Sequence, residues 1–376
     1  GAINPLFFNG LSSGNRTLFD KIKTLEAGYY LEYCLNTKSH IKTQFFDLSS
    51  LVNPSEYLEN AALSNNELTE KIEAALERSV KSHLVSDVKA GILFSAGLDS
   101  SLISALASKL TNDPLDLFKY QSDNLDDFET ANNFASQFGA ELHISNTNDS
   151  DIIFNLPHLI YSYEMLNKAD GSALSMVCSD AYKKDYKVLL TGDAADEVFA
   201  GYPSFENFRT HSYLNQQLNL PKINKLINKI IPGFRGILSE SLHHLISPFD
   251  DRFLKPFIDF TLFEGESDEE FSKSKDAYSF VDNDHELRAN SFLLDEVKSR
   301  LERFLIRSDR VGMANSIELR TPFLSKELVA LALNIPFNKR SIFLPSIKQR
   351  RMFRSKYPLR TLAKKLNIGA SIIDRP

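Results

Sequence analysis

Short apolar runs alternate with longer amphipathic segments through the middle of the chain. The runs have the length and composition of strands that are buried on both faces, and they are residues 90–94, 115–120, 141–144 and 186–190. The segments between them repeat apolar residues with the period of a helix, and they are residues 100–110, 127–138 and 172–184. Because strand and helix alternate, the pattern predicts an α/β fold with a doubly wound, mostly parallel sheet.

The N-terminal flank follows another pattern. Short strand-like stretches separated by turns occur at residues 17–19, 27–33 and 43–46. An Asn-Pro-Ser break at residues 53–55 separates them from residues 64–84, an amphipathic helical segment for which Ser64 or Asn65 is the cap. The strand-like stretches are too few to form a domain alone.

The C-terminal half is helical in pattern. Residues 205–285 are rich in Leu, Ile and Phe but are interrupted by prolines, and residues 295–333 predict a strongly helical region. The acidic stretch 264–276 is typical of a solvated loop rather than a binding tail.

The overall composition excludes several classes of protein. The chain has 376 residues, of which 43% are hydrophobic, which is enough for two domains or for one large domain with an appendage. Its formal net charge of −6 argues against a nucleic-acid-binding or anionic-membrane surface and favours a small-molecule or protein partner. Two cysteines, no apolar run of about 18 residues and no signal-peptide pattern predict a soluble, cytoplasmic protein.

The first buried run ends in a loop, Ser95-Ala96-Gly97-Leu98-Asp99-Ser100-Ser101, that is suited to an anion. Gly97 lets the backbone turn closely around a ligand, and the helix that follows begins with N–H groups that lack intrahelical acceptors. The hydroxyls of Ser95, Ser100 and Ser101 add donors for phosphate oxygens. The loop lacks the Gly-Lys-Ser/Thr ending of a mononucleotide P-loop, so it does not suggest transfer of a γ-phosphoryl group.

Asp99 lies inside this predicted phosphate loop. A carboxylate there would repel phosphate unless a divalent cation bridged the two groups, so Asp99 indicates Mg²⁺. Taken alone, the loop is also compatible with a capped helix start that has no ligand.

A second buried run, residues 188–190, also ends in a glycine turn followed by acids. The turn is Thr191-Gly192-Asp193-Ala194-Ala195-Asp196-Glu197. Ligands of open α/β sheets gather at the carboxyl ends of the strands, so both loops are expected to face one crevice, with Asp196 as a second Mg²⁺ ligand. The alternative is that these acids only complement a helix N-terminus.

Together the two loops resemble the synthetase domain of the glutamine-hydrolysing asparagine synthase family, whose loops read Ser-Gly-Gly-Leu-Asp-Ser-Ser and Ser-Gly-Glu-Gly-Ser-Asp-Glu. A third block, residues 309–324 (DRVGMANSIELRTPFL), resembles the family's Asp-Arg-x-x-Met-Ala-x-Ser-x-Glu-x-Arg-x-Pro-Phe-Leu. Residues 17–31 resemble the end of the family's glutaminase domain, and residues 356–360 resemble its Gly-Lys-Tyr-x-Leu-Arg segment.

The resemblance implies a domain organisation. Residues 1–55 would be the tail of an N-terminal glutaminase-like domain, and residues 56–376 an ATP-pyrophosphatase domain of the adenine nucleotide α-hydrolase type with a helical C-terminal part. The chain starts with Gly1 and offers no N-terminal cysteine as a glutamine nucleophile. We therefore expect that the chain as given does not hydrolyse glutamine.

The resemblance also implies a reaction, ATP-dependent amide-bond formation through an acyl-adenylate with release of AMP and pyrophosphate. The residues that it assigns to ATP, with adenine near the two aromatic ones, are Phe94, Ser95, Gly97, Asp99, Ser100, Tyr120, Thr191 and Gly192. Mg²⁺ would lie between Asp99 and Asp196. Lys356, or less strongly Arg310, would be the cation that stabilises departing pyrophosphate, and Asp193 stands where the family has a catalytic glutamate.

Departures from the family pattern bear on the acceptor. Asp193 is one methylene shorter than the family's glutamate, and residues 167–171 (NKADG) lack the arginine of a Thr-x-x-Arg segment, for which Lys168 is an imperfect substitute. These changes weaken aspartate as the acceptor. Ala96, in place of a glycine, is a milder change if its backbone angle suits a side chain.

Several alternatives stay open. The acceptor is a small-molecule or peptide carboxylate, as in asparagine, sugar-carboxamide, β-lactam or lasso-peptide biosynthesis, and the donor is ammonia or another amine. A glutaminase domain or subunit and a second copy of the chain are the protein partners that the resemblance admits. A non-catalytic paralogue, or another pyrophosphatase such as a thiolation or nucleotide-modifying enzyme, is the competing class.

Overall fold

The structure is a computed structural model. It describes residues 17, 19, 21–121, 125–146, 149–163, 170–206, 208–210, 273–346 and 351–375. Most of the region 205–285 that was predicted to be helical, most of the acidic stretch 264–276 and residues 167–169 lie outside the described residues.

Five parallel strands form the central sheet, in the order β5-β4-β3-β6-β7. They are β3 (Ala90–Leu93), β4 (Asp116–Tyr120), β5 (Glu141–Ser145), β6 (Val188–Leu190) and β7 (Glu318–Arg320). The first four coincide with the apolar runs of the sequence, and all neighbours in the sheet are parallel. This confirms the predicted α/β class with a mostly parallel, doubly wound sheet.

Strand β7 corrects one prediction. Residues 295–333 were expected to be helical, and they are so in the last part of α14 (Asp284–Ala314) and in α15 (Lys326–Leu333), but β7 lies between these helices and pairs with β6 at the sheet edge. The strand has only three residues, Glu-Leu-Arg, and the polar residues at both its ends are partly exposed. It therefore lacks the apolar run that a strand buried on both faces shows.

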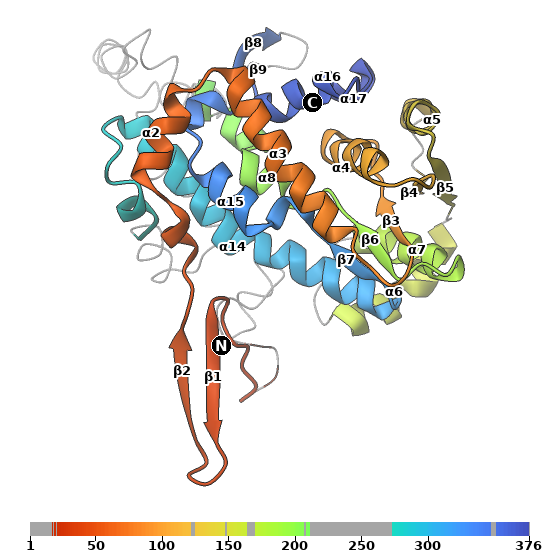
Figure 1. Cartoon of the computed structure of the whole chain (residues 1–376). Helices are drawn as coiled ribbons and strands as arrows, with labels where there is room; N and C mark the ends of the chain where they lie inside the picture. The colour runs from red at the N-terminus through yellow and green to blue at the C-terminus, as the bar shows by residue number, and fades with distance from the viewer. Residues whose placement is uncertain are drawn as a thin grey trace, which may run out of the picture.

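Helices connect the strands and cover the sheet, as the alternation predicted (Figure 1). Those before β7 are α2 (Pro54–Ala62), α3 (Asn65–His83), α4 (Leu98–Leu110), α5 (Leu125–Phe138), α6 (Asp149–Tyr163), α7 (Asp170–Lys183) and α8 (Ala195–Phe199). Those after it are α15 (Lys326–Leu333), α16 (Tyr357–Lys365) and α17 (Ala370–Ile373), and the short 3₁₀ turns are η1 (Leu48–Leu51), η3 (Pro322–Leu324) and η4 (Phe337–Lys339). Ser64 caps α3 in a capping box with Glu67, as its sequence position predicted.

Two cores lie on opposite faces of the sheet because strand side chains alternate. Leu117 of β4 belongs to the larger core, to which α3, α4 and α16 also contribute. Phe118, the next residue, belongs to a smaller core that α7 covers with Val177, Cys178 and Ala181. The apolar runs of the sequence therefore mark strands whose two faces are both buried.

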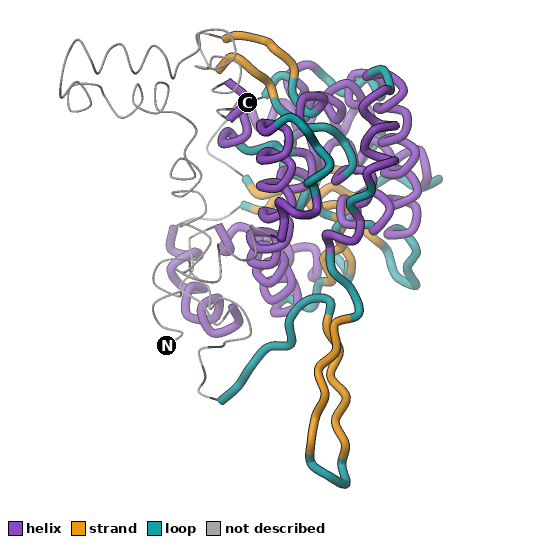
Figure 2. Tube along the Cα trace, turned by 90° about the vertical axis from the view of Figure 1, so that its left-hand side faces the viewer, coloured by secondary structure: helices purple, strands orange, loops and turns teal. Residues whose placement is uncertain are grey.

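A hairpin projects from the body of the molecule (Figures 1 and 2). Its strands β1 (Tyr29–Cys34) and β2 (Ser39–Gln44) are antiparallel, and within the described part of the chain they pair only with each other. The second strand starts four residues before the stretch 43–46 that the sequence indicated. Large apolar side chains are exposed along the hairpin, namely Tyr30, Leu31, Tyr33, Ile41 and Phe45.

The C-terminal part adds a second small sheet and a buried arginine. Strands β8 (Ile342–Ser346) and β9 (Arg351–Arg354) pair in antiparallel fashion, and β9 leads into α16. The guanidinium of Arg340 is fully buried and donates hydrogen bonds to the backbone carbonyls of Val198, Ala332 and Ile335. This arginine fastens the end of α8 to α15. Over the described ranges, no helix has both the length and the apolar character needed to cross a membrane.

Candidate active site

The two predicted loops lie side by side at the carboxyl ends of adjacent strands. Strand β3 leads into residues 94–97 and then α4, and β6 leads into residues 191–194 and then α8. An ideal Cβ on Gly192 would lie 2.8 Å from the backbone nitrogen of Ser100 and 3.1 Å from the Cβ of Asp99. Gly192 therefore allows the second loop to touch the start of α4, and the single crevice expected from the sequence is present.

The first loop has the polar lining of an anion site. The hydroxyls of Ser95 and Ser100 lie 3.0 Å apart, and the backbone N–H of Gly97 donates to the Ser95 hydroxyl at 3.2 Å. Gly97 is the N-cap of α4, and no side chain in the described part of the chain caps the N–H groups of this first turn. The N-terminus of a 13-residue helix with two hydroxyls beside it is suited to phosphate oxygens.

Lys356 lies between the two carboxylates that were predicted to bind a metal. Its Nζ is 2.7 Å from Oδ2 of Asp99 and 2.7 Å from Oδ1 of Asp196. The lysine side chain is only 6% exposed, whereas the side chains of Asp99 and Asp196 are 20% and 39% exposed. These three residues thus form one charge cluster around the buried lysine, although they are far apart in the sequence. Two of them were predicted as metal ligands and one as a catalytic cation.

The backbone around Lys356 is adapted to this contact. Lys356 is the N-cap of α16 and has φ of 52°, in the left-handed region that a residue with a side chain adopts only when its surroundings enforce it. An ideal Cβ on Gly201 would lie 1.9 Å from Oδ1 of Asp196 and 2.1 Å from Cε of Lys356. Only glycine at position 201 leaves room for the ion pair.

The electrostatics keep Lys356 charged. Burial alone would lower the pKa of its ammonium, but the carboxylates of Asp99 and Asp196 outweigh burial and raise that pKa above the ordinary lysine value. Burial also raises the pKa of the Asp99 carboxyl above its ordinary value, and the Lys356 ammonium opposes that shift.

One carboxylate oxygen fits a metal ligand. Oδ1 of Asp99 is buried and has no hydrogen-bond partner among the described residues, while Oδ2 of the same carboxylate binds Lys356. A buried carboxylate oxygen without a partner is costly, and a hard cation such as Mg²⁺ is bound by such oxygens. The donor set of Asp99 and Asp196 therefore fits the predicted ion.

A pocket of about 240 Å³ opens beside the cluster. The residues that line it are Leu93, Ser95, Asp99, Ser100, Gly192, Asp193, Ala194, Asp196, Glu197, Tyr202, Phe304 and Arg307. Six of these were predicted from the sequence as site residues. The pocket thus joins the two loops to one face of α14.

Helix α14 contributes residues that the sequence did not single out. Phe304 and Arg307 line the pocket, and the hydroxyl of Ser308 donates to Oδ2 of Asp193 at 3.0 Å. Ser308 is buried, so it holds the Asp193 carboxylate toward α14. The spacing of 304, 307 and 308 places these residues on one face of the helix, directly before the third motif. That spacing is the signal that could have identified them.

Other predicted site residues lie away from this pocket. Phe94 is buried, and its ring centroid is 4.9 Å from that of Phe134 in the larger core. Tyr120 packs against the smaller core. Thr191 is fully buried, and its hydroxyl accepts a hydrogen bond from the backbone N–H of Asp193. Neither aromatic ring lines the pocket, so the predicted adenine position stays a prediction.

Arg310 faces another part of the molecule. Its Nη1 donates a 2.7 Å hydrogen bond to the backbone carbonyl of Tyr163 at the end of α6. The side chain does not line the pocket, whereas Lys356 touches two pocket residues. Of the two predicted cations, the structure brings only Lys356 to the carboxylates.

Alanines occupy left-handed positions in both loops. Ala96 has φ of 56° and Ala194 has φ of 75°, and both stand where the family motifs quoted above have glycine. Ala96 was expected to be a mild change if its backbone angle suited a side chain. Its left-handed angle does not meet that condition, because glycine adopts this conformation more readily than alanine. Each left-handed alanine costs about 1 kcal/mol, so the loops hold strained backbone.

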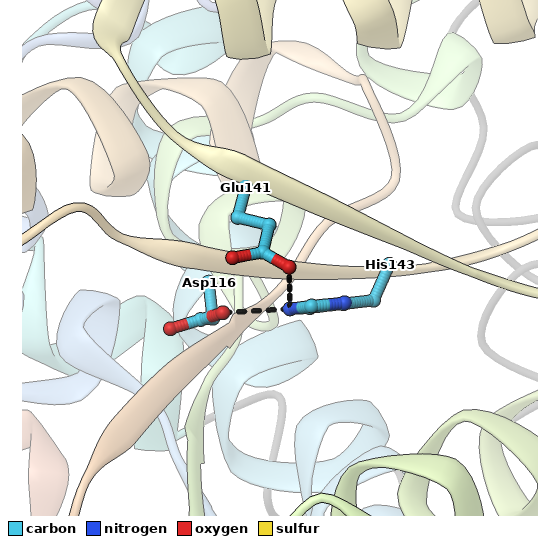
Figure 3. A group of neighbouring side chains, drawn as sticks. All are labelled: Asp116, Glu141 and His143. Atoms are coloured by element: carbon cyan, nitrogen blue, oxygen red, sulfur yellow. Dashed lines mark hydrogen bonds and ion pairs between the residues drawn. The ribbon is translucent and has the colours of Figure 1, made fainter.

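A second group of ligand-type side chains lies at the opposite end of the strands (Figure 3). Nε2 of His143 is 2.6 Å from Oδ1 of Asp116 and 3.8 Å from Oε1 of Glu141, and the hydroxyl of Tyr186 donates to Oδ2 of Asp116. Both oxygens of Asp116 are thus engaged by protein groups, in contrast to Oδ1 of Asp99. The group is satisfied by hydrogen bonds at the rim of the smaller core, whereas Asp99 has an open ligand position.

The protein is of the α/β class with an open parallel sheet. An acidic pocket beside a helix N-terminus that is suited to phosphate lies at the carboxyl ends of its strands. The sequence model of the asparagine synthase family matches residues 71–376, so the chain belongs to that family. This confirms the resemblance that the three motifs indicated.

Curated relatives agree with this assignment. The chain is 25% identical over 292 residues to asparagine synthetase [glutamine-hydrolyzing] 1 of Bacillus subtilis, covering 72% of this chain and 44% of the relative. It is 28% identical over 213 residues to asparagine synthetase B [glutamine-hydrolyzing] of Escherichia coli, covering 52% and 36%. It is 25% identical over 394 residues to amidase chyE of Penicillium rubens, covering 93% and 57%. The chain spans about half the length of the curated relatives that it matches.

Proposed function

We propose that the protein is an ATP-dependent carbon–nitrogen ligase that activates a carboxylate as an acyl-adenylate. The observation that carries the proposal is the cluster of Asp99, Asp196 and Lys356 beside a helix N-terminus that is flanked by serine hydroxyls. A triphosphate needs cationic groups and N–H donors, and the carboxylates beside it need a divalent cation. The site brings together a cationic group, N–H donors and carboxylates that a divalent cation would neutralise.

The reaction would proceed in two displacements. An oxygen of the acceptor carboxylate attacks the α-phosphorus of ATP, the bond to the β-phosphate oxygen breaks, and pyrophosphate leaves. An amine then attacks the acyl carbon, loses a proton, and displaces AMP. Between these steps the acyl-adenylate must be kept from water, so the buried inner wall of the pocket is as important as its charges.

The residues of this chain have distinct tasks in that scheme. The amides and hydroxyls of residues 95–101 would hold phosphate oxygens, and the Lys356 ammonium would stabilise the charge of departing pyrophosphate. Asp99 and Asp196 would bind Mg²⁺, which supplies charge neutralisation of the triphosphate when it is bound. Asp193 accepts a hydrogen bond from Ser308 and lines the pocket, and it stands at the motif position where the family has a glutamate.

The identity of the acceptor is the finer part of the proposal. Relatives include proteins named asparagine synthetases and one named an amidase, so aspartate and other carboxylates are both candidates. The Ser308 hydroxyl holds the short Asp193 carboxylate in place at the pocket wall, and this departure from the family's longer glutamate favours an acceptor other than aspartate. Ser308→Ala should then raise the KM for the acceptor that is used, without a comparable change in the KM for ATP.

The test is pyrophosphate release from ATP with Mg²⁺ across a panel of carboxylates and ammonia. Asp196→Asn should abolish release, whereas Asp180→Asn, which removes the same charge from an exposed pair with Lys183, should leave it unchanged. Release with at least one acceptor supports the ligase. No release with any acceptor, from protein that still unfolds cooperatively, would support a non-catalytic paralogue instead.

The nitrogen source involves a partner. We propose that a glutaminase domain packs against the hairpin of β1 and β2, because residues 17–31 resemble the end of such a domain and both hairpin faces expose large apolar side chains. The chain alone should then use ammonium but not glutamine. Use of glutamine by the purified chain alone would contradict this part of the proposal.

A further inference from the structure

The ammonium of Lys356 occupies the gap between the carboxylates to which the proposed function assigns a metal. It contacts Oδ2 of Asp99 and Oδ1 of Asp196 at the same distance, 2.7 Å, so it bridges them symmetrically. The side chain of Lys356 is only 6% exposed, so its ammonium is held between the two carboxylates and away from bulk water. A cation of the protein itself is thus already bound to this pair.

We propose that Lys356 is the resident counter-ion of Asp99 and Asp196, and that a divalent cation binds this pair only together with ATP. The inference rests on the proposed function, since it takes these carboxylates as the metal ligands. It adds an order of binding, in which free Mg²⁺ is rejected and the metal–nucleotide complex is accepted.

The charges explain why nucleotide is required. The ammonium already offsets negative charge of the two carboxylates, which makes them a weak site for a divalent ion that must approach within a few ångströms of the ammonium. The triphosphate of ATP brings further negative charge to the adjacent helix N-terminus. The ammonium can then exchange a carboxylate for a phosphate oxygen, and the freed carboxylate oxygens, with Oδ1 of Asp99, become available to the metal.

The structure confines this exchange to the end of the lysine side chain. The Cε of Lys356 lies against Gly201, where even a methyl group would collide with it, and the backbone N–H of the following residue, Tyr357, donates to the carbonyl of Arg340. The stem and backbone of Lys356 are therefore fixed. Only the terminal ammonium has alternative partners within reach, which are the two carboxylates and a ligand in the pocket.

Binding of Mn²⁺, measured by electron paramagnetic resonance on the full chain without nucleotide, tests the proposal. Lys356→Gln should bind Mn²⁺ more tightly than wild type by about tenfold or more, because the competing cation is gone. Lys365→Gln, which removes an exposed lysine from the other end of the same helix, should bind like wild type. Adding Asp196→Asn to Lys356→Gln should abolish the gain.

Folding of each variant is checked by circular dichroism, and Lys356→Met replaces Lys356→Gln if the latter does not fold. Equal Mn²⁺ affinity of wild type and the Lys356 variant without nucleotide would overturn the counter-ion proposal. A separate arm adds a non-hydrolysable ATP analogue to wild type. If Mn²⁺ and the analogue fail to bind even together, the proposed function fails; if they bind together but the Lys356 variant shows no gain alone, only the counter-ion proposal fails.

Discussion

Gly201 offers a sharp test of how the charge cluster is packed. In Gly201→Ala, the new Cβ would lie 1.9 Å from Oδ1 of Asp196 and 2.1 Å from Cε of Lys356, whereas ordinary van der Waals contact begins at 3.4 Å. Something must move, and the Asp196 carboxylate is the more exposed and therefore the more mobile of the two. The clash with Cε remains if only the carboxylate moves, so we expect Asp196 to rotate away, the chain around Lys356 to shift, and the two residues to lose their contact.

The cost follows from that lost contact. A hydrogen bond between charged groups contributes about 1.5–3 kcal/mol, and the partial exposure of Asp196 favours the lower end of that range. Replacing glycine by alanine also restricts the unfolded chain, which returns about 0.4–1 kcal/mol. Gly369→Ala is the matched control because its Cβ would meet only Ser371 Oγ, at an ordinary 3.7 Å. The two variants should differ in unfolding free energy by about 2 kcal/mol.

Urea unfolding followed by far-ultraviolet circular dichroism measures this difference, since the chain has no tryptophan to report by fluorescence. Pyrophosphate release should fall in Gly201→Ala on the order of a hundredfold, because the displaced carboxylate no longer holds its position. Gly369→Ala should retain activity. If both variants unfold at the same urea concentration, the packing around Lys356 is looser than described and the reasoning is refuted.

Three further predictions concern stability. Arg340→Met should cost about 3 kcal/mol or more in urea unfolding, because it leaves three buried backbone carbonyls without their donor. Ala96→Gly should stay within about 0.5 kcal/mol of wild type, since relief of the left-handed strain offsets the buried methyl, whereas Ala105→Gly in helix α4 should lose about 1 kcal/mol or more. Burial works against the ionised Asp47, but hydrogen bonds, led by those from Ser49, outweigh it and lower its pKa to about 2. Its folded pKa is depressed, so the stability that Asp47 contributes above about pH 4 should disappear as the pH falls toward 2, and Asp47→Asn should remove that part of the pH dependence in thermal unfolding.

The fold was predictable where burial dominates. Strands such as 90–93 and 188–190 are buried on both faces, and the resulting apolar runs are distinctive in the sequence. The edge strand 318–320 was missed because, among the described residues, it pairs with another strand on one side only, so polar residues are accepted there. The composition of a segment indicates whether it is buried. It therefore indicates a strand only where that strand is buried on both faces.

The site was predictable where chemistry is local. Glycine turns and helix starts mark two segments in the sequence, the loop from Ser95 to Ser101 and the acids from Asp193 to Glu197. Because the strands before them were predicted to be parallel, both segments were expected to face one crevice. The contact of Ser308 with Asp193 joins residues 115 positions apart, and although its spacing from 304 and 307 places Ser308 on one face of a helix, nothing in the sequence indicates what that face contacts. Such a partner is set by how α14 packs, which the sequence pattern does not specify.

Lys356 shows why the C-terminal segment matters to the chemistry. It is 257 residues from Asp99 and reaches that carboxylate only because α16 packs against α3 and α4 and because Arg340, next to the start of the small sheet, is anchored to the end of α8. The acidic pair formed by Asp99 and Asp196 would repel itself if it were buried without the ammonium. Docking of α16 therefore completes the charge balance of the site, and the carboxylates are held together in the pocket only once the C-terminal part of the chain has folded onto the sheet.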